Sequence, residues 1–169
     1  TPCVSYVDVR TRRLLHKSDM PDRRFNTGHL FMLSGRESVV VSAPRLGLGV
    51  EHPGAISRQK AGQNLSVIDK PQAVTEALLG EALSVLALPA QDLLMVTHPT
   101  PGLVTLWRLG RGEHVKSLAL PHARGLVQSQ DGQTVWISFG TAASLCALSL
   151  RTFELVPEQV MVNTLLAGS

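Results

Sequence analysis

The feature that most constrains this sequence is a group of short strands that recurs about every 40 residues. Three segments each combine an apolar strand, a short polar turn and a second strand: Val4–Leu15, Val104–Val115 and Leu145–Val156. A fourth, weaker copy runs from Asn64 to Val74. A chain that repeats one strand pattern at this interval is typical of a repeat architecture. The anchors that we assign to the four copies are Val7, Ile68, Trp107 and Leu148.

A second sequence pattern recurs at a similar interval and completes the repeating unit. The strands VVVS, LMVT and VWIS end at Ser42, Thr97 and Ser138, and another apolar stretch precedes each of them. Polar turns such as Asp131-Gly132 separate the strands, as hairpins require. One unit therefore holds four short strands in about 40 residues, which is the signature of a β-propeller blade.

The fold prediction is therefore an all-β chain, a β-propeller with WD40-like blades that occupies residues 1–169 as one segment. A single four-stranded sheet cannot bury both faces, so neighbouring blades stack around an axis. We count about four blades and predict that they are part of a larger, seven-bladed ring. Open edges are expected at Cys3–Val9 and Val160–Leu166, to be covered by further blades or by self-association with another copy.

The unequal spacing of the anchors predicts two departures from the repeat. Residues 44–63 are rich in Gly and Pro without a clear period, which indicates a long loop. Residues 71–79 break the strand pattern, with Asp69 as a capping residue, Pro71 in the first turn and Gly80 at the end. These signals predict a short helix at 71–79, and an extended blade strand is the alternative.

Composition excludes several classes of protein. The chain is 44% hydrophobic and 17% charged, which favours a packed core over disorder. A net charge of +3 is too small to indicate nucleic-acid binding. The sequence contains no run of 18 apolar residues, so no membrane-spanning helix is predicted. Cys3 and Cys146 lie in apolar, strand-like segments, so we expect free thiols, with a disulfide as the alternative.

Several of these segments resemble the C-terminal half of an uncharacterised bacterial family. In that family a T-S-P-x-G-G turn precedes a V-x-x-W-D strand; here Thr97, Pro99 and Gly102 match the turn, and Val104 and Trp107 match the strand. The family's R-H-L entry to an inner strand resembles Gly28-His29-Leu30. Arg108 stands where the family has Asp. The resemblance implies an exported, periplasmic propeller of unknown function, often encoded beside imelysin-type iron-uptake and di-haem proteins.

Four residues are the candidates for a ligand-binding site. His29 begins a predicted inner strand, and inner strands line the central channel where propellers bind ligands. Arg23 and Arg24 precede it and have the chemistry to hold a carboxylate or another anion. His98 lies in a turn rich in Pro. The alternatives are a hydrogen-bonded structural histidine for His29 and a solvated hairpin for the arginines.

No catalytic residue and no metal ligand set is predicted, because no HExxH or CxxC spacing is present; the cofactor is unknown. The first hypothesis is a binding or scaffold module for a protein partner or a small ligand, with a role in periplasmic iron handling that rests on the resemblance. The second is a propeller enzyme or oxidoreductase subunit with a metal or cofactor in the channel. Fold alone does not choose between them.

Overall fold

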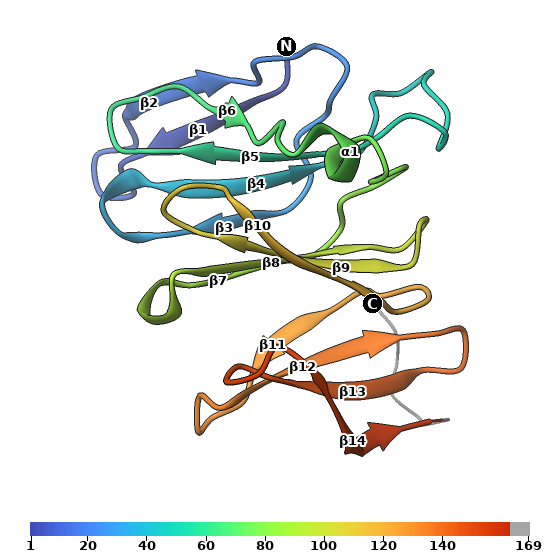
Figure 1. Cartoon of the computed structure of the whole chain (residues 1–169). Coiled ribbons are helices and arrows are strands. Elements are labelled where there is room, and N and C mark those ends of the chain that lie inside the picture. The colour runs from blue at the N-terminus through green and yellow to red at the C-terminus, as the bar shows by residue number, and fades with distance from the viewer. Residues whose placement is uncertain (163–169) are drawn as a thin grey trace.

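The computed structural model describes residues 1–162, which form four antiparallel sheets stacked one on another (Figure 1). The first sheet pairs β1 (Cys3–Val7) with β2 (Leu14–Asp19). The second holds β3 (Leu30–Met32), β4 (Ser38–Ser42), β5 (Ala55–Gln59) and β6 (Ser66–Val67). The third holds β7 (Val85–Leu88), β8 (Leu93–His98), β9 (Leu103–Arg108) and β10 (His114–Ala119). The fourth holds β11 (Leu126–Gln128), β12 (Thr134–Phe139), β13 (Ser144–Ser149) and β14 (Leu155–Met161).

The sheets meet along their first strands, as the blades of a propeller do. In the three complete sheets each strand pairs with its neighbour in sequence, so a sheet is a simple meander. Strand β7 contacts both β3 and β11, which places the three first strands side by side at the inner edge. The prediction of an all-β propeller with about four blades is therefore confirmed. Three blades are complete, and the β1–β2 hairpin supplies two strands of another.

The hydrophobic core lies between the sheets. In β8, Leu94 and Val96 pack toward the second sheet, whereas Leu93 and Met95 pack toward the fourth. Successive side chains of a strand point to opposite faces, so a strand between two sheets is apolar at nearly every position. A smaller cluster around Val40 joins the second sheet to the hairpin. Burial of each large aliphatic side chain contributes about 1.5–3 kcal/mol, which holds neighbouring blades together.

One hairpin turn recurs between the third and fourth strands. A residue at the end of the third strand donates its N–H to the carbonyl of the residue five positions on. Its own carbonyl accepts from the N–H of the residue four positions on, which has a positive φ in all three copies. These first and left-handed residues are Asp8 and Arg12, Arg108 and Gly112, and Ser149 and Phe153. The residues before the turns, Val7, Trp107 and Leu148, therefore occupy equivalent positions, and each pairs with the residue seven positions further on.

The second sheet differs from the prediction in two respects, the long loop at 44–63 and the anchor at Ile68. Strand β5 lies inside the predicted loop, and Ile68 follows the fourth strand of the sheet instead of lying in its third. Gln59 takes the equivalent place, since its side chain points to the preceding sheet, where Tyr6 Oη donates to Gln59 Oε1 at 2.9 Å. The strand forms because five register pairs with β4 satisfy its backbone, a tertiary effect that overrides its mixed local composition.

The helix predicted at 71–79 is shorter in the structure. Helix α1 spans Gln72–Thr75, and Pro71 occupies the N-cap position without a side-chain cap. Residues 78–80 leave the helical path because their backbone bonds to the loop before β5: Gly54 N donates to Leu78 O at 3.0 Å, and Gly80 N donates to His52 O at 2.8 Å. Asp69 contributes only its backbone carbonyl, which accepts from Thr75 Oγ1.

Gly54 occupies a close approach between the second sheet and the segment after α1. A Cβ atom there would overlap the carbonyl oxygens of Ser42 and Gly80, which are backbone atoms that cannot swing away. We expect Gly54→Ala to lower the free energy of unfolding by about 1–3 kcal/mol, measured by urea denaturation. Gly110→Ala is the matched control, because its new Cβ would meet only the carboxylate of Asp92; equal losses in both variants would contradict the expectation.

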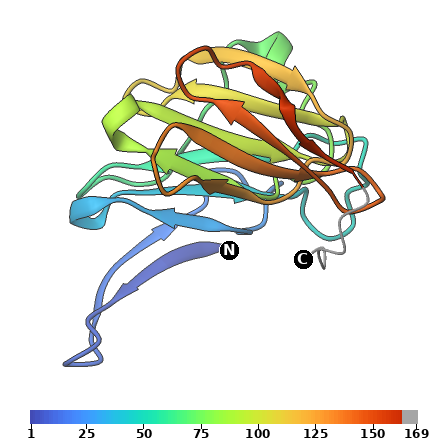
Figure 2. The same ribbon diagram turned by 90° about the horizontal axis from the view of Figure 1, so that it is seen from below.

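The two outer faces of the stack are partly apolar and exposed. The β1–β2 hairpin projects from the body, and Val7 and Leu14 are 53% and 60% exposed on it (Figure 2). On the fourth sheet, Val127 is 61% and Val160 is 40% exposed. The edge predicted at Val160–Leu166 coincides with the end of β14, and positions 163–166 lie outside the described residues. No helix among the described residues has the length and apolar character to cross a membrane.

Candidate functional site on one rim of the blades

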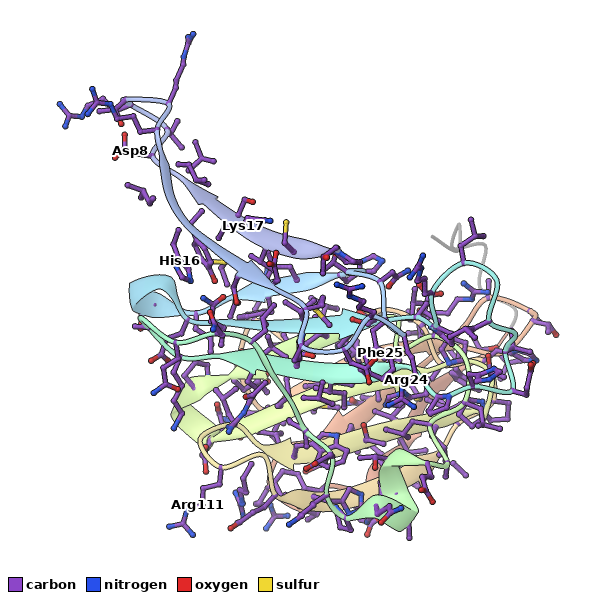
Figure 3. All side chains as sticks on the ribbon, turned by 90° about the horizontal axis from the view of Figure 1, so that it is seen from above. Asp8, His16, Lys17, Arg24, Phe25 and Arg111 are labelled. Carbon is purple, nitrogen blue, oxygen red and sulfur yellow. The ribbon has the colours of Figure 1, made fainter. Side chains whose placement is uncertain are left out.

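Two kinds of loop lie together on one rim of the stack, which we call the entry rim. They are the segments that lead into each first strand and those that join each second strand to the third: 20–29, 43–54, 68–84, 99–102, 120–125 and 140–143. Figure 3 shows Arg24 and Phe25 of this rim on the side opposite Asp8 and Arg111, which lie in the recurring hairpin turns. We call the opposite side the turn rim. Three of the four candidate residues belong to entry-rim loops, and His98 ends the strand next to one.

His29 lies at the start of the inner strand β3, where its side chain is exposed. Its carbonyl accepts from Val41 N at 2.9 Å, and Gly28 N donates to Val41 O at 3.0 Å. A Cβ at position 28 would lie 2.8 Å from that same oxygen, so the approach to β4 requires glycine. The backbone before the strand thus fixes the position of His29 on the entry rim.

In the third and fourth sheets, a hydroxyl near the end of the second strand accepts a hydrogen bond from the backbone just before the first strand. Ser138 Oγ accepts from Gly125 N at 2.8 Å. Thr97 Oγ1 accepts from Ser84 N at 3.0 Å and donates to Arg124 O at 2.7 Å, which links the third sheet to the fourth. Ser42 has no such bond among the described residues, and its buried Oγ lacks a partner there. The hydroxyls of Thr97 and Ser138 therefore position the inner strands of the third and fourth sheets. In the second sheet Val41 makes the equivalent backbone bonds, to Gly28 and His29.

The two candidate arginines differ in how their charge is compensated. Arg24 donates to Asp22 Oδ2 through Nε at 2.9 Å and Nη2 at 2.7 Å. This hydrogen bonding from Arg24 lowers the pKa of the Asp22 carboxyl below its ordinary value. Arg23 is exposed and forms no ion pair with any described residue. Arg23 therefore presents an uncompensated charge to solvent, whereas Arg24 mainly fixes its own loop beside the buried Phe25.

The structure contradicts the prediction that His98 binds a ligand, because this residue is part of the core. Its side chain is fully buried, and its Nε2 lies 2.9 Å from Thr105 Oγ1, which also accepts from Trp107 Nε1 at 2.8 Å. Burial lowers the pKa of His98 to about 3, so the imidazole is neutral at physiological pH. The sequence placed His98 in the turn after the strand, but it is the last residue of β8 and points inward.

Sequence reasoning missed Arg124 and His122, which lie on the same rim at the entry to β11. Both are exposed, and together with Ser138 and Phe139 they line a hollow of about 480 Å³. The signal was present, because Arg124-Gly125 leads into a first strand as Gly28-His29 does. A second hollow of about 680 Å³ lies between the loop of Asp22 and Arg24 and helix α1. Arg23 and Arg124 supply donors for anions at the entries to β3 and β11. Other loops of the entry rim carry exposed acidic side chains, which are Glu51, Asp69, Glu76 and Glu81.

Neither cysteine forms a disulfide in the described part of the chain. Cys3 and Cys146 are free, and burial raises the pKa of Cys146 to about 11, so its thiol is protonated and unreactive. Within residues 1–162, no three His, Cys, Asp or Glu side chains gather closely enough to hold a metal ion.

Comparison with known proteins gives one family and a set of solved structures. The model of a protein family of unknown function, DUF1513, matches residues 1–161. No curated protein matches the sequence. A protein of unknown function from Bacteroides caccae is similar in structure, with 15% identity and a TM-score of 0.57 over 91% of this chain and 54% of its own.

Two enzymes have similar structures. The periplasmic gluconolactonase PpgL of Pseudomonas aeruginosa has 17% identity and a TM-score of 0.55 over 99% of this chain and 50% of its own. The dihydro-heme d1 dehydrogenase NirN, in complex with DHE, has 11% identity and a TM-score of 0.64 over 94% of this chain and 33% of its own. The chain thus spans between a third and about half of these proteins, and at such identities the likeness shows the fold alone.

Proposed function

The chain belongs to the DUF1513 family of unknown function. From the exposed basic side chains on its entry rim we propose that the chain is a binding module that recognises an anionic ligand or an acidic protein partner there. The resemblance noted in the sequence extends the proposal to a periplasmic location and a role in iron handling. In a binding role the entry rim contacts the ligand or partner, and it needs no catalytic side chain.

The observation that carries the proposal is a set of exposed basic side chains that do not pair with a described acidic side chain. Arg23, His29, His122 and Arg124 lie on entry-rim loops of the second and fourth sheets, and none of their side chains has a hydrogen-bond or ion-pair partner among the described residues. Arg24, which is paired with Asp22, does not add to this set. Guanidinium groups bind carboxylates and phosphates through paired N–H donors, which makes such ligands the chemical class that the rim suits.

The proposal includes a larger ring around the same axis. The chain matches only part of the length of similar propellers, and its outer sheet faces expose apolar side chains. A seven-bladed ring would cover these faces, and the loops of its further blades would extend the entry rim around a central channel. Self-association of the open edges is the alternative way to cover them.

A propeller enzyme with a metal or cofactor in the channel is the second candidate. It is supported by the gluconolactonase and the dehydrogenase among the similar structures. Metal and cofactor analysis of the purified full-length protein separates the two candidates. A stoichiometric metal or chromophore would favour the enzyme and count against a simple binding module.

Titration with citrate, a probe with three carboxylates, tests the binding proposal directly. We expect the full-length protein to bind citrate, and the Arg23→Gln/Arg124→Gln double variant to bind at least about tenfold more weakly, because each lost charged hydrogen bond costs about 1.5–3 kcal/mol. Calorimetry at two salt concentrations is the measurement, since added salt screens exposed charges and weakens such binding.

Arg111→Gln is a control for this titration, because Arg111 is basic and exposed but pairs with Glu113 at 3.7 Å and lies on the turn rim (Figure 3). Its citrate affinity is expected to equal that of the wild type. Absence of citrate binding, or an equal loss in the control and the double variant, would overturn the assignment of the entry rim.

A further inference from the structure

The first copy of the recurring hairpin turn, between β1 and β2, differs from the other two in charge. The turn occupies residues 8–13, and its counterparts occupy residues 108–113 and 149–154. Its last residue is basic, whereas the last residue of both counterparts is acidic: Arg13, Glu113 and Glu154. Each of the two glutamates pairs with a basic side chain of the third sheet, which is Arg111 for the first and Lys116 for the second.

The first turn therefore presents basic side chains that no acidic side chain pairs with. Arg10, Arg12 and Arg13 are exposed, and none of them forms an ion pair with a described residue. Asp8 is the only acidic residue in the turn, and its Oδ1 accepts from Thr11 N at 2.6 Å and from Thr11 Oγ1 at 2.8 Å. Its carboxylate thus holds the shape of the turn, and three positive charges against one negative leave a net charge of +2.

Aliphatic side chains on both sides of these arginines are exposed as well. Val9 is 92% exposed, whereas its counterparts Leu109 and Leu150 are partly buried against the core. Leu14 and Leu15, at the start of β2, are 60% and 53% exposed. Because the hairpin projects from the body of the stack (Figure 2), we call residues 9–15 the hairpin tip.

From this combination of charge and exposed apolar surface we infer that the hairpin tip docks onto an anionic lipid surface. Such a surface supplies phosphates for the guanidinium groups and, directly beneath them, an apolar layer for Val9 and the two leucines. Nucleic acid supplies no such layer, and the tip has no aromatic side chain to stack on bases. The tip lies on the turn rim, so this inference is independent of the proposed entry-rim site.

Co-sedimentation of the full-length protein with lipid vesicles tests the role of the charges. We expect at least about tenfold tighter binding to vesicles of equal parts phosphatidylglycerol and phosphatidylcholine than to vesicles of phosphatidylcholine alone. Arg10→Gln/Arg13→Gln should bind the anionic vesicles at least about tenfold more weakly, because each arginine near such a surface contributes about fivefold. Equal binding to both kinds of vesicle would overturn the inference.

Two controls separate the tip from other basic surfaces. Arg151→Gln is the matched control, because Arg151 is exposed and occupies the place of Arg10 in the third copy of the turn. Arg23→Gln/Arg124→Gln removes the entry-rim arginines. Both control variants should bind anionic vesicles as the wild type does, and losses equal to that of Arg10→Gln/Arg13→Gln would assign the binding to overall charge and overturn the inference.

Val9→Ser distinguishes a lipid surface from an acidic protein partner, because it leaves the charge of the tip unchanged. We expect at least about fivefold weaker binding to the anionic vesicles, since the aliphatic side chain no longer enters the apolar layer. Val127→Ser, at an exposed valine of the fourth sheet, should bind as the wild type does. Wild-type affinity of Val9→Ser for vesicles, or binding of polyglutamate without binding of vesicles, would point to an acidic protein partner and overturn the inference.

Discussion

Replacement of Trp107 by alanine is expected to lower the free energy of unfolding by about 3–5 kcal/mol, the largest effect of any single substitution that we consider. Trp107 is completely buried between the second and third sheets, against Val39, Val41 and Leu94. Its indole N–H donates to Thr105 Oγ1 at 2.8 Å. The substitution therefore opens a cavity between two blades and also removes a buried hydrogen bond.

Trp136→Ala is the matched control for this prediction. Trp136 is only partly buried, on the face of β12 that points away from the third sheet, whereas its neighbours Val135 and Ile137 point into the core. Urea denaturation followed by circular dichroism measures both variants without relying on tryptophan fluorescence. Trp107→Ala should lose at least about 2 kcal/mol more than Trp136→Ala, and equal losses would show that the interface between the second and third sheets does not dominate stability.

Acidification is expected to destabilise the protein through His98. Its pKa is about 3 in the folded state, below the value near 6.5 that an exposed histidine has in the unfolded chain. Between these values the unfolded chain binds the extra proton, so the contribution of neutral His98 is complete above pH 6.5 and is lost as the pH falls toward 3. Each pH unit in this window costs about 1.4 kcal/mol, or about 3 kcal/mol between pH 7 and pH 4.

A comparison with His98→Gln isolates this effect from that of the acidic groups. Glutamine is polar and does not titrate, so the variant should be less stable at pH 7 but should lose less stability on acidification. The difference between wild type and variant in free energy of unfolding, measured at each half unit from pH 7 to pH 4, should therefore shrink by about 3 kcal/mol. A constant difference would show that His98 becomes protonated without unfolding.

The strand pattern predicted most of the fold, because neighbouring blades repeat the same order of four strands and turns. The four-strand unit, the propeller class and the place of the second strands followed from alternation and turn residues. The recurring hairpin explains why Arg10-Thr11 and Arg151-Thr152 recur, since both lie in the turn that joins the third strand to the fourth. These features depend on local sequence, which a single chain displays directly.

Strand β5 and the true extent of α1 could not be predicted, because tertiary contacts decide both. The residues of β5 include Ser57, Arg58 and Gln59, which do not form an apolar run, and the strand depends on pairing with β4. The helix ends early because residues 78–80 bond to the loop before β5. Long-range pairing of this kind leaves little trace in local sequence.

The candidate site was predicted in part, for a similar reason. The position of His29 at an inner-strand entry followed from the repeat, and its neighbour Arg23 followed from its place in the same loop. The burial of His98 and the pairing of Arg24 with Asp22 depend on side-chain direction, which the pattern does not specify. Arg124 was missed although its segment leads into a first strand as Gly28-His29 does, because the sequence pattern does not specify which side chains of these segments are exposed.

The meander order of the strands has a consequence for how the protein is made. Every sheet consists of consecutive strands, so nearly all pairing partners of a strand are synthesised within about 25 residues of it. During translation each blade is therefore able to close soon after its fourth strand leaves the ribosome and then serve as the template on which the following blade condenses. We expect assembly to advance from the N-terminal end, with little waiting for distant partners.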